Sequence, residues 1–175
     1  MMKKNVIGLA VLSCLFAAGA ANAADGTINF TGSVLATACT VNAQTATQSV
    51  ELGSVNASGF TSAGKVAGAT RFNITLASCP DTITKTSVKF DGTPDATNSS
   101  LLALTSGQTA TGLAVAIYEA DGTTLIPMQT ASAAKDIPAD ATSTTMTFIA
   151  KYMSTAATVG AGTAAASTSF TIAYN

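Results

Sequence analysis

The chain contains no histidine and no tryptophan, and only 10% of its 175 residues are charged. Without histidine it cannot form a Ser-His-Asp or Cys-His pair, cannot offer an imidazole to zinc and lacks the usual general base at neutral pH. These absences argue against most classes of enzyme. We therefore expect no catalytic residue, no bound cofactor and no metal site.

The chain also lacks an excess of positive charge, because eight lysines and arginines stand against nine acidic residues and the formal net charge is −1. A nucleic-acid partner needs basic surface that neutralises phosphates, so we expect none. The composition does not predict disorder either, because disordered chains combine low hydrophobicity with high charge, whereas 47% of these residues are hydrophobic. The length suits one domain.

The one long apolar run lies at the N-terminus and predicts a secretory signal peptide. Lys3 and Lys4 precede the apolar run Val6–Ala21, and small residues then allow cleavage between Ala23 and Ala24. A permanent membrane anchor would need about 20 apolar residues, more than this run offers. Removal of the first 23 residues leaves 152, and the loss of two lysines changes the net charge from −1 to −3. We expect an exported mature chain without a membrane anchor.

Cysteine is scarce, and its use is simple once the signal peptide is removed. Cys14 leaves with the signal peptide, which leaves Cys39 and Cys79, separated by 40 residues. Two cysteines in an exported chain are expected to pair, because that compartment is oxidising. Closing a loop of this length stabilises a fold by roughly 4 kcal/mol in the chain-entropy description. The alternatives are two free thiols or a metal pair, and two ligands without histidine make a poor metal site.

The rest of the chain has the two-residue period of β-strands rather than a helical stripe. Many short strands separated by turns predict an all-β sandwich, and the dipeptide Asp121-Gly122 could join two of them as a hairpin. Alternation predicts half-buried strands at Arg71–Leu76, Met146–Tyr152 and Ser169–Tyr174, and shorter apolar runs predict others at Val50–Leu52, Val88–Phe90, Leu101–Leu104, Leu113–Tyr118 and Leu125–Met128.

The phase of the alternation slips near residue 34. Even positions carry the first pattern, which consists of Gly26, Ile28, Phe30, Gly32 and Val34, and odd positions carry the next, which consists of Leu35, Thr37, Cys39 and Val41. A shift by one residue turns the apolar face of a strand over. Residues 26–34 and 35–41 therefore either serve different surfaces or form one long first strand with a bulge, and the periodicity does not separate the two interpretations.

Several segments together resemble the chaperone–usher pilins, in particular the major subunits of type 1-like fimbriae. The C-terminal pattern is the most specific, because Tyr174 is penultimate, apolar residues alternate back from it and Gly162 is the fourteenth residue from the end. The other segments are Gly26–Val34, Ala38–Asn42 with Cys79, Phe90–Asp95 followed by Leu101–Leu104, and Gly112–Gly122. Together these segments, in this order, span essentially the whole chain after the signal peptide.

This resemblance implies an incomplete immunoglobulin-like β-sandwich that lacks its last strand and is completed by a donor strand from another chain. Residues 24–34 would be the donor extension and residues 35–175 the pilin domain. The implied donor residues are Gly26, Ile28, Phe30, Gly32 and Val34. The implied acceptor edge, which the chaperone also contacts, consists of Gly162, Phe170, Ile172 and Tyr174. The disulfide Cys39–Cys79 would tie the first strands together.

The implied function is that of a structural subunit of a bacterial surface fimbria that supports adhesion. Its implied partners are identical or related pilin subunits, a periplasmic chaperone and an outer-membrane usher, and its route leads through the periplasm to the cell surface. The alternatives are a minor adaptor pilin and a self-contained exported binding or adhesin module. A third alternative, an exported hydrolase, would have to use isolated carboxylates such as Asp91 and Asp95.

Overall fold

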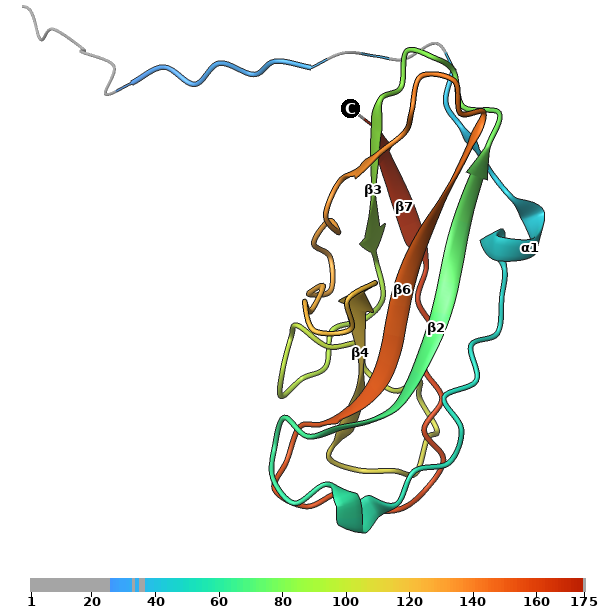
Figure 1. Ribbon diagram of the computed structural model, residues 1–175. Helices are drawn as coiled ribbons and strands as arrows, with labels where there is room; N and C mark the ends of the chain where they lie inside the picture. Colours follow the sequence, from blue (N-terminus) through green and yellow to red (C-terminus); the bar gives the residue numbers. More distant parts are fainter. Residues whose placement is uncertain (1–25, 33, 35–36, 175) are drawn as a thin grey trace, which may run out of the picture. The chain divides into compact units, whose positions relative to one another are not determined.

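The computed structural model describes residues 26–32, 34 and 37–174 (Figure 1). It divides the chain into two units, Met1–Val34 and Leu35–Asn175. The described residues of the first unit have no regular secondary structure, so every helix and strand of the described chain belongs to the second unit. The predicted signal peptide and its cleavage site between Ala23 and Ala24 lie outside the described residues.

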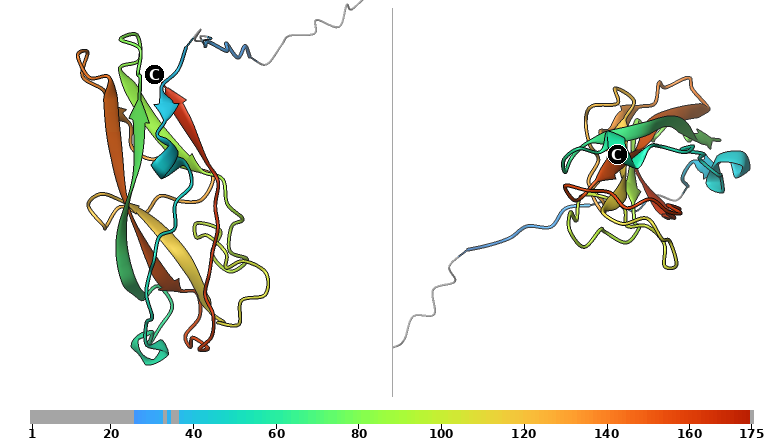
Figure 2. Two further views of the ribbon diagram at one scale, coloured as in Figure 1. Left: turned by 90° about the vertical axis from the view of Figure 1, so that its right-hand side faces the viewer. Right: turned by 90° about the horizontal axis from the view of Figure 1, so that it is seen from below.

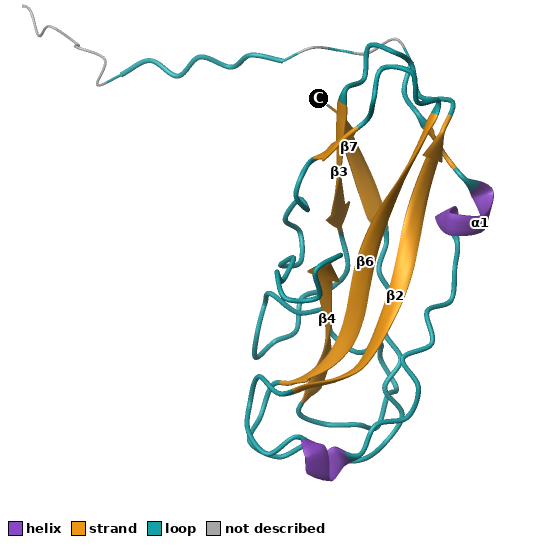
Figure 3. Ribbon diagram, in the orientation of Figure 1, coloured by secondary structure: helices purple, strands orange, loops and turns teal. Residues whose placement is uncertain are grey.

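The second unit is a sandwich of two antiparallel sheets, as the sequence predicted (Figures 1 and 3). One sheet has the order β1-β2-β6-β4 and the other the order β5-β3-β7. The strands are β1 (Thr40–Val41), β2 (Val66–Ala77), β3 (Lys85–Phe90), β4 (Leu113–Glu119), β5 (Lys135–Asp136), β6 (Ser143–Ser154) and β7 (Phe170–Tyr174). Two short helices, α1 (Ala43–Ala46) and the 3-10 helix η1 (Ala57–Gly59), lie outside the sheets.

The long strands β2 and β6 follow the predicted alternation. Ile74 and Leu76 are buried and Phe72 is half-buried, whereas the polar residues between them point to the other face. Strand β6 pairs with β2 in register, with Phe148 opposite Phe72 and Met146 opposite Ile74. The apolar residues of both strands therefore share one face, which is the face that the second sheet covers.

Three phenylalanines join the two sheets at the centre of the core. Phe72 and Phe148 come from the first sheet and Phe90 from the second, and their ring centroids lie 5.2 to 6.1 Å apart. Two of the three pairs meet edge to face, the geometry that aromatic quadrupoles favour. Phe90 and Phe148 are each 1% exposed, so this part of the core is closed to water.

Some predicted strands are shorter or absent. Residues 50–52 form no strand. Leu102 makes only isolated bridges, to Pro94 and Val115, and Leu125 makes one isolated bridge, to Tyr118. The turn at Asp121-Gly122 does form, because the amide of Gly122 donates to the carbonyl of Glu119, and the chain returns beside β4. Within the described residues no helix has both the length and the apolar character that crossing a bilayer requires.

Candidate functional site

Strand β7 leaves one edge of the core uncovered. It pairs with β3 on one side, where Val88 lies opposite Ile172 and Phe90 lies opposite Phe170. In the described part of the chain its other edge pairs with no strand. Val88 and Phe90 are buried, yet Phe170, Ile172 and Tyr174 point into the same core and remain only half-buried. A sandwich core with one strip of half-exposed apolar side chains is missing a strand at that place.

The uncovered strip is longer than β7 itself. Alternate residues from Ala164 to Tyr174 are all half-buried, and the residues between them are exposed. We call Ala164–Tyr174 the open edge. Its inward side chains are large toward Tyr174 and small toward Ala164. Across from it, the segment from Val41 to Val55 supplies further half-buried apolar side chains that pack against the same core, and Figure 2 (left) shows this segment descending beside the chain that leads into β7.

The small-residue end of the open edge borders a cavity of about 330 Å³, which we call the end cavity. Both sides contribute to its lining, which includes Gly53, Val55, Phe60, Val159, Gly162 and Ala164. Most of the lining side chains are small or apolar. This cavity could therefore accept one medium-sized apolar side chain from outside the domain.

The opposite end of the open edge is closed by Tyr174. Its hydroxyl donates a hydrogen bond of 3.1 Å to the backbone carbonyl of Cys39, and a disulfide links Cys39 to Cys79, as the sequence predicted. Burial raises the pKa of Tyr174, so the hydroxyl keeps the proton that it donates. The last strand and the first strand are thus tied together at this end.

The first unit carries apolar side chains that nothing covers. Ile28, Phe30 and Val34 are 78%, 91% and 101% exposed. Exposed apolar patches usually mark interaction sites. A Cβ placed on Gly32 would meet no atom within 4 Å, and Gly32 does not have a positive φ, so its own chain does not require glycine there. An extended segment with exposed apolar side chains at every second position, and a glycine that allows close backbone approach, suits addition as a strand to another molecule.

Gly162, which the resemblance places at the acceptor edge, also packs closely against a distant loop. It lies eight residues before β7 and is not part of that strand. A methyl group on Gly162 would overlap the backbone of Thr109 and Ala110, so glycine is needed for the close pairing of this segment with the loop at residues 105–112. This pairing forms part of the wall of the end cavity. Nothing in the sequence around Gly162 identified this partner loop, nor did it identify Val55 and Phe60 as lining residues.

The two carboxylates considered above for a hydrolase, Asp91 and Asp95, have structural partners. Asp91 accepts hydrogen bonds from Lys89 and Thr171, which hold its pKa below the ordinary value. In a turn, the carboxylate of Asp95 accepts hydrogen bonds of 3.0 Å from the backbone amides of Thr97 and Asn98. The residues that the structure describes include no group of three or more histidine, cysteine or acidic side chains able to hold a metal ion.

Comparisons with known proteins agree with this geometry. The chain matches the family described as Fimbrial protein over residues 28–175. It is 35% identical to the "Type-1 fimbrial protein, A chain" of Salmonella typhi, with 99% of this chain and 100% of the relative covered. It is 34% identical to the "Probable major fimbrial subunit LpfA" of Escherichia coli O157:H7, with 99% and 97% covered.

Solved structures show the same fold. The type I fimbria protein BPSL1626 of Burkholderia pseudomallei is 35% identical, with a TM-score of 0.61 and coverage of 85% of this chain and 97% of that one. The P pilus rod subunit PapA superposes with a TM-score of 0.66 at 22% identity, with 79% of this chain and 100% of that one covered.

Proposed function

Because this chain belongs to the fimbrial protein family and is a non-enzymatic structural subunit of chaperone–usher pili, located in surface fimbriae, we propose that it polymerises by donating residues 26–34 to the open edge of the next subunit. The observation that carries the proposal is the pairing of two incomplete features in one chain. One is the segment 26–34, whose apolar side chains Ile28, Phe30 and Val34 are exposed. The other is a sandwich core that lacks a strand beside β7.

The inserted strand runs antiparallel to β7. Every strand pair of the second unit is antiparallel, and antiparallel pairs are the more common kind. This direction sets Gly26 beside the large side chain of Tyr174 and brings Val34 to the small-residue end and its cavity. From Gly26 to Val34 a strand of nine residues spans about 27 Å, the same length as the nine residues from Ala166 to Tyr174.

The three exposed side chains supply most of the driving force. Burying Ile28, Phe30 and Val34 stabilises the complex by about 1.5–3 kcal/mol each, and main-chain hydrogen bonds add a ladder along β7. Ordering the donor segment offsets part of this gain. Because the donating and accepting surfaces are different, the contact is heterologous and does not close on itself, so repetition produces a filament.

Before assembly the open edge needs a temporary partner, since an exposed strand edge beside an uncovered core promotes aggregation. We propose that a periplasmic chaperone lends a strand to this edge and that an outer-membrane usher exchanges it for the next donor, a form of β-augmentation that includes chaperone–pilin complementation. Changing Tyr174 to Ser should then reduce capture by the chaperone. Co-purification at the stoichiometry of the natural chain would remove Tyr174 from this role.

The polymer mechanism can be tested by separating donor from acceptor. A chain without residues 24–33 should still accept a strand but be unable to donate one. Refolding it with a synthetic peptide of residues 24–35 should give a capped monomer with greatly raised thermal stability, because the peptide binds only the folded form. If residues 26–34 instead belong to a first strand of their own domain, intact chains will be stable monomers without peptide or chaperone.

We also propose that the chain forms the shaft rather than an adaptor, which the names of its relatives favour. An antibody against this chain should label cell-surface filaments along their whole length in electron microscopy. Labelling confined to the tips would assign it to an adaptor position.

A further inference from the structure

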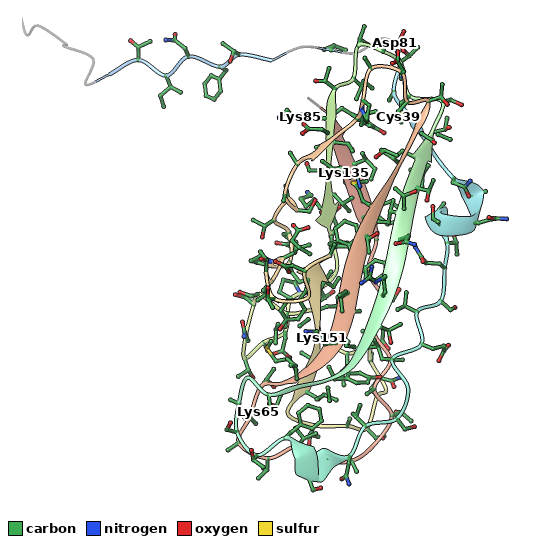
Figure 4. The ribbon with its side chains drawn as sticks, in the orientation of Figure 1. Cys39, Lys65, Asp81, Lys85, Lys135 and Lys151 are labelled. Atoms are coloured by element: carbon green, nitrogen blue, oxygen red, sulfur yellow. A yellow bond between two sulfur atoms is a disulfide. The ribbon has the colours of Figure 1, made fainter. Side chains whose placement is uncertain are left out.

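The two ends of the second unit differ in charge. Lys65 is the only charged residue in the loops around the end cavity, which are residues 53–65, 105–112 and 155–169. Asp81 lies at the opposite end of the sandwich (Figure 4), beside the disulfide. The amide of Cys79 donates to the carbonyl of Thr142 at 3.1 Å, so the loop that carries Asp140 lies at this end as well. We call it the acidic end after Asp81 and Asp140; Lys85, which pairs with Asp136, and Lys135 lie toward it too.

The charges of Lys65, Asp81 and Asp140 are exposed, and among the described residues they belong to no ion pair. In the described part of the chain the ion pairs are Lys85 with Asp136 and Lys89 with Asp91. Lys65, Asp81 and Asp140 belong to neither pair, and all three residues are exposed. Their exposed positions leave them available to another molecule.

The backbones that carry these charges are fixed. The amide of Lys65 donates to the Ser154 hydroxyl at 3.0 Å, and the amide of Ser154 donates to the Lys65 carbonyl at 2.9 Å. Asp81 and Asp140 both lie in hydrogen-bonded turns, which Pro80 and Pro138 begin with bonds of 3.0 and 2.9 Å. Charged residues on a fixed backbone can set the orientation of one subunit relative to another, because only their side chains, and not the backbone, have to be ordered when the subunits meet.

The proposed donor direction brings opposite ends of successive subunits together. Val34 of the donating subunit reaches the end cavity of the acceptor, where Lys65 lies. Cys39 of the donating subunit follows five residues later, which is at most about 18 Å of chain. Cys39 is bonded to Cys79, two residues from Asp81, so the acidic end of the donating subunit must lie near the Lys65 end of the acceptor.

We propose that Lys65 of one subunit contacts Asp81 and Asp140 of the next subunit in the filament, and that this contact fixes the angle between successive sandwiches. The inference rests on the proposed strand donation and adds a second, body-to-body interface to it. A strand inserted parallel to β7 would instead bring two acidic ends together, where like charges repel.

Zero-length crosslinking tests the contact in intact filaments. A carbodiimide activates a carboxylate, a lysine amine that touches it displaces the activated group to form an amide, and the reagent leaves as a urea. Filaments should be assembled from a mixture of ¹⁵N-labelled and unlabelled chains, so that a crosslink between subunits contains one heavy and one light peptide. We expect Lys65 joined to Asp81 or Asp140 in such mixed pairs, and no such product from monomers capped with the peptide of residues 24–35.

Variants separate this contact from its neighbours. Lys65→Glu should weaken association of the bodies by about 1.5- to 5-fold, the range of exposed ion pairs, and give filaments with a less uniform angle between subunits. Asp81→Lys with Asp140→Lys in the same chain as Lys65→Glu should restore the angle. Lys151→Gln is the matched control, because the Lys151 amine already donates to the Gly122 carbonyl.

The outcomes are distinguishable. If the peptide stabilises the truncated chain and filaments form, yet Lys65 is absent from the mixed crosslinks or joins other carboxylates, the body-to-body contact is wrong and strand donation stands. If the peptide does not stabilise the truncated chain, strand donation itself is wrong, and the inference falls with it.

Discussion

Phe30 should contribute more to donor binding than any other side chain of residues 26–34. It is 91% exposed in its own chain, and it stands in the middle of the alternation, so insertion would take nearly its whole ring out of water. Burial of a phenylalanine side chain is worth about 1.5–3 kcal/mol. At 1.4 kcal/mol for each factor of ten, Phe30→Ala should weaken binding of the donor peptide by about 10- to 150-fold.

The assay is a competition on the chain without residues 24–33, refolded with a fluorescent peptide of residues 24–35. Unlabelled peptides displace the probe, and their relative affinities give the cost of each substitution. Thr31→Ser is the matched control, because Thr31 lies on the other face of the same strand and should change the affinity by less than about threefold, as exposed substitutions do. Phe30→Asp should be worse than Phe30→Ala, since an unpaired carboxylate would enter an apolar site.

Two results would refute this reasoning. Phe30→Ala could bind within twofold of the natural peptide, which would mean that the ring stays in water and the even positions do not face the acceptor. Alternatively, Thr31→Ser could cost as much as Phe30→Ala, which would mean that odd positions contact the acceptor as closely as even positions and that the alternation carries no specificity.

Three further predictions concern the second unit. Replacing Cys39 and Cys79 by Ser should lower the free energy of urea unfolding by about 2–5 kcal/mol, and the natural chain should show no free thiol by mass spectrometry without reductant; two alkylatable thiols in the native protein would contradict this. Because burial raises the pKa of Tyr174 above 10.0, the folded chain holds this proton more tightly than the unfolded chain, so stability present below pH 10 should fall as the pH rises through the raised pKa. Urea unfolding of the peptide-filled chain should show a smaller alkaline decline in Tyr174→Phe, and an unchanged decline would exclude Tyr174 as a source. Gly162→Ala should cost about 1–3 kcal/mol through overlap with the facing loop, whereas Gly59→Ala, where a Cβ meets no atom within 4 Å, should be nearly neutral in the same measurement.

The sequence alone determined the features that depend on local periodicity. The alternation in β2, β6 and β7 predicted which side chains face the core, because a strand sends successive side chains to opposite faces whatever lies around it. The disulfide followed from counting cysteines in an exported chain. The exposed alternation from Gly26 to Val34 was readable for the same reason, although the periodicity could not say which molecule receives it.

Only the tertiary structure decided the features that depend on distant segments. Val50 and Leu52 were predicted to lie in a strand, but they pack against the core without belonging to a sheet. A short apolar run does not reveal whether a neighbouring strand comes within hydrogen-bonding distance. Gly162 needs its glycine because a loop some fifty residues earlier packs against it. Lys65 and Asp81 likewise lie at opposite ends of the sandwich because of the path of the folded chain. No local sequence pattern predicts the distance between two isolated charges in exposed turns.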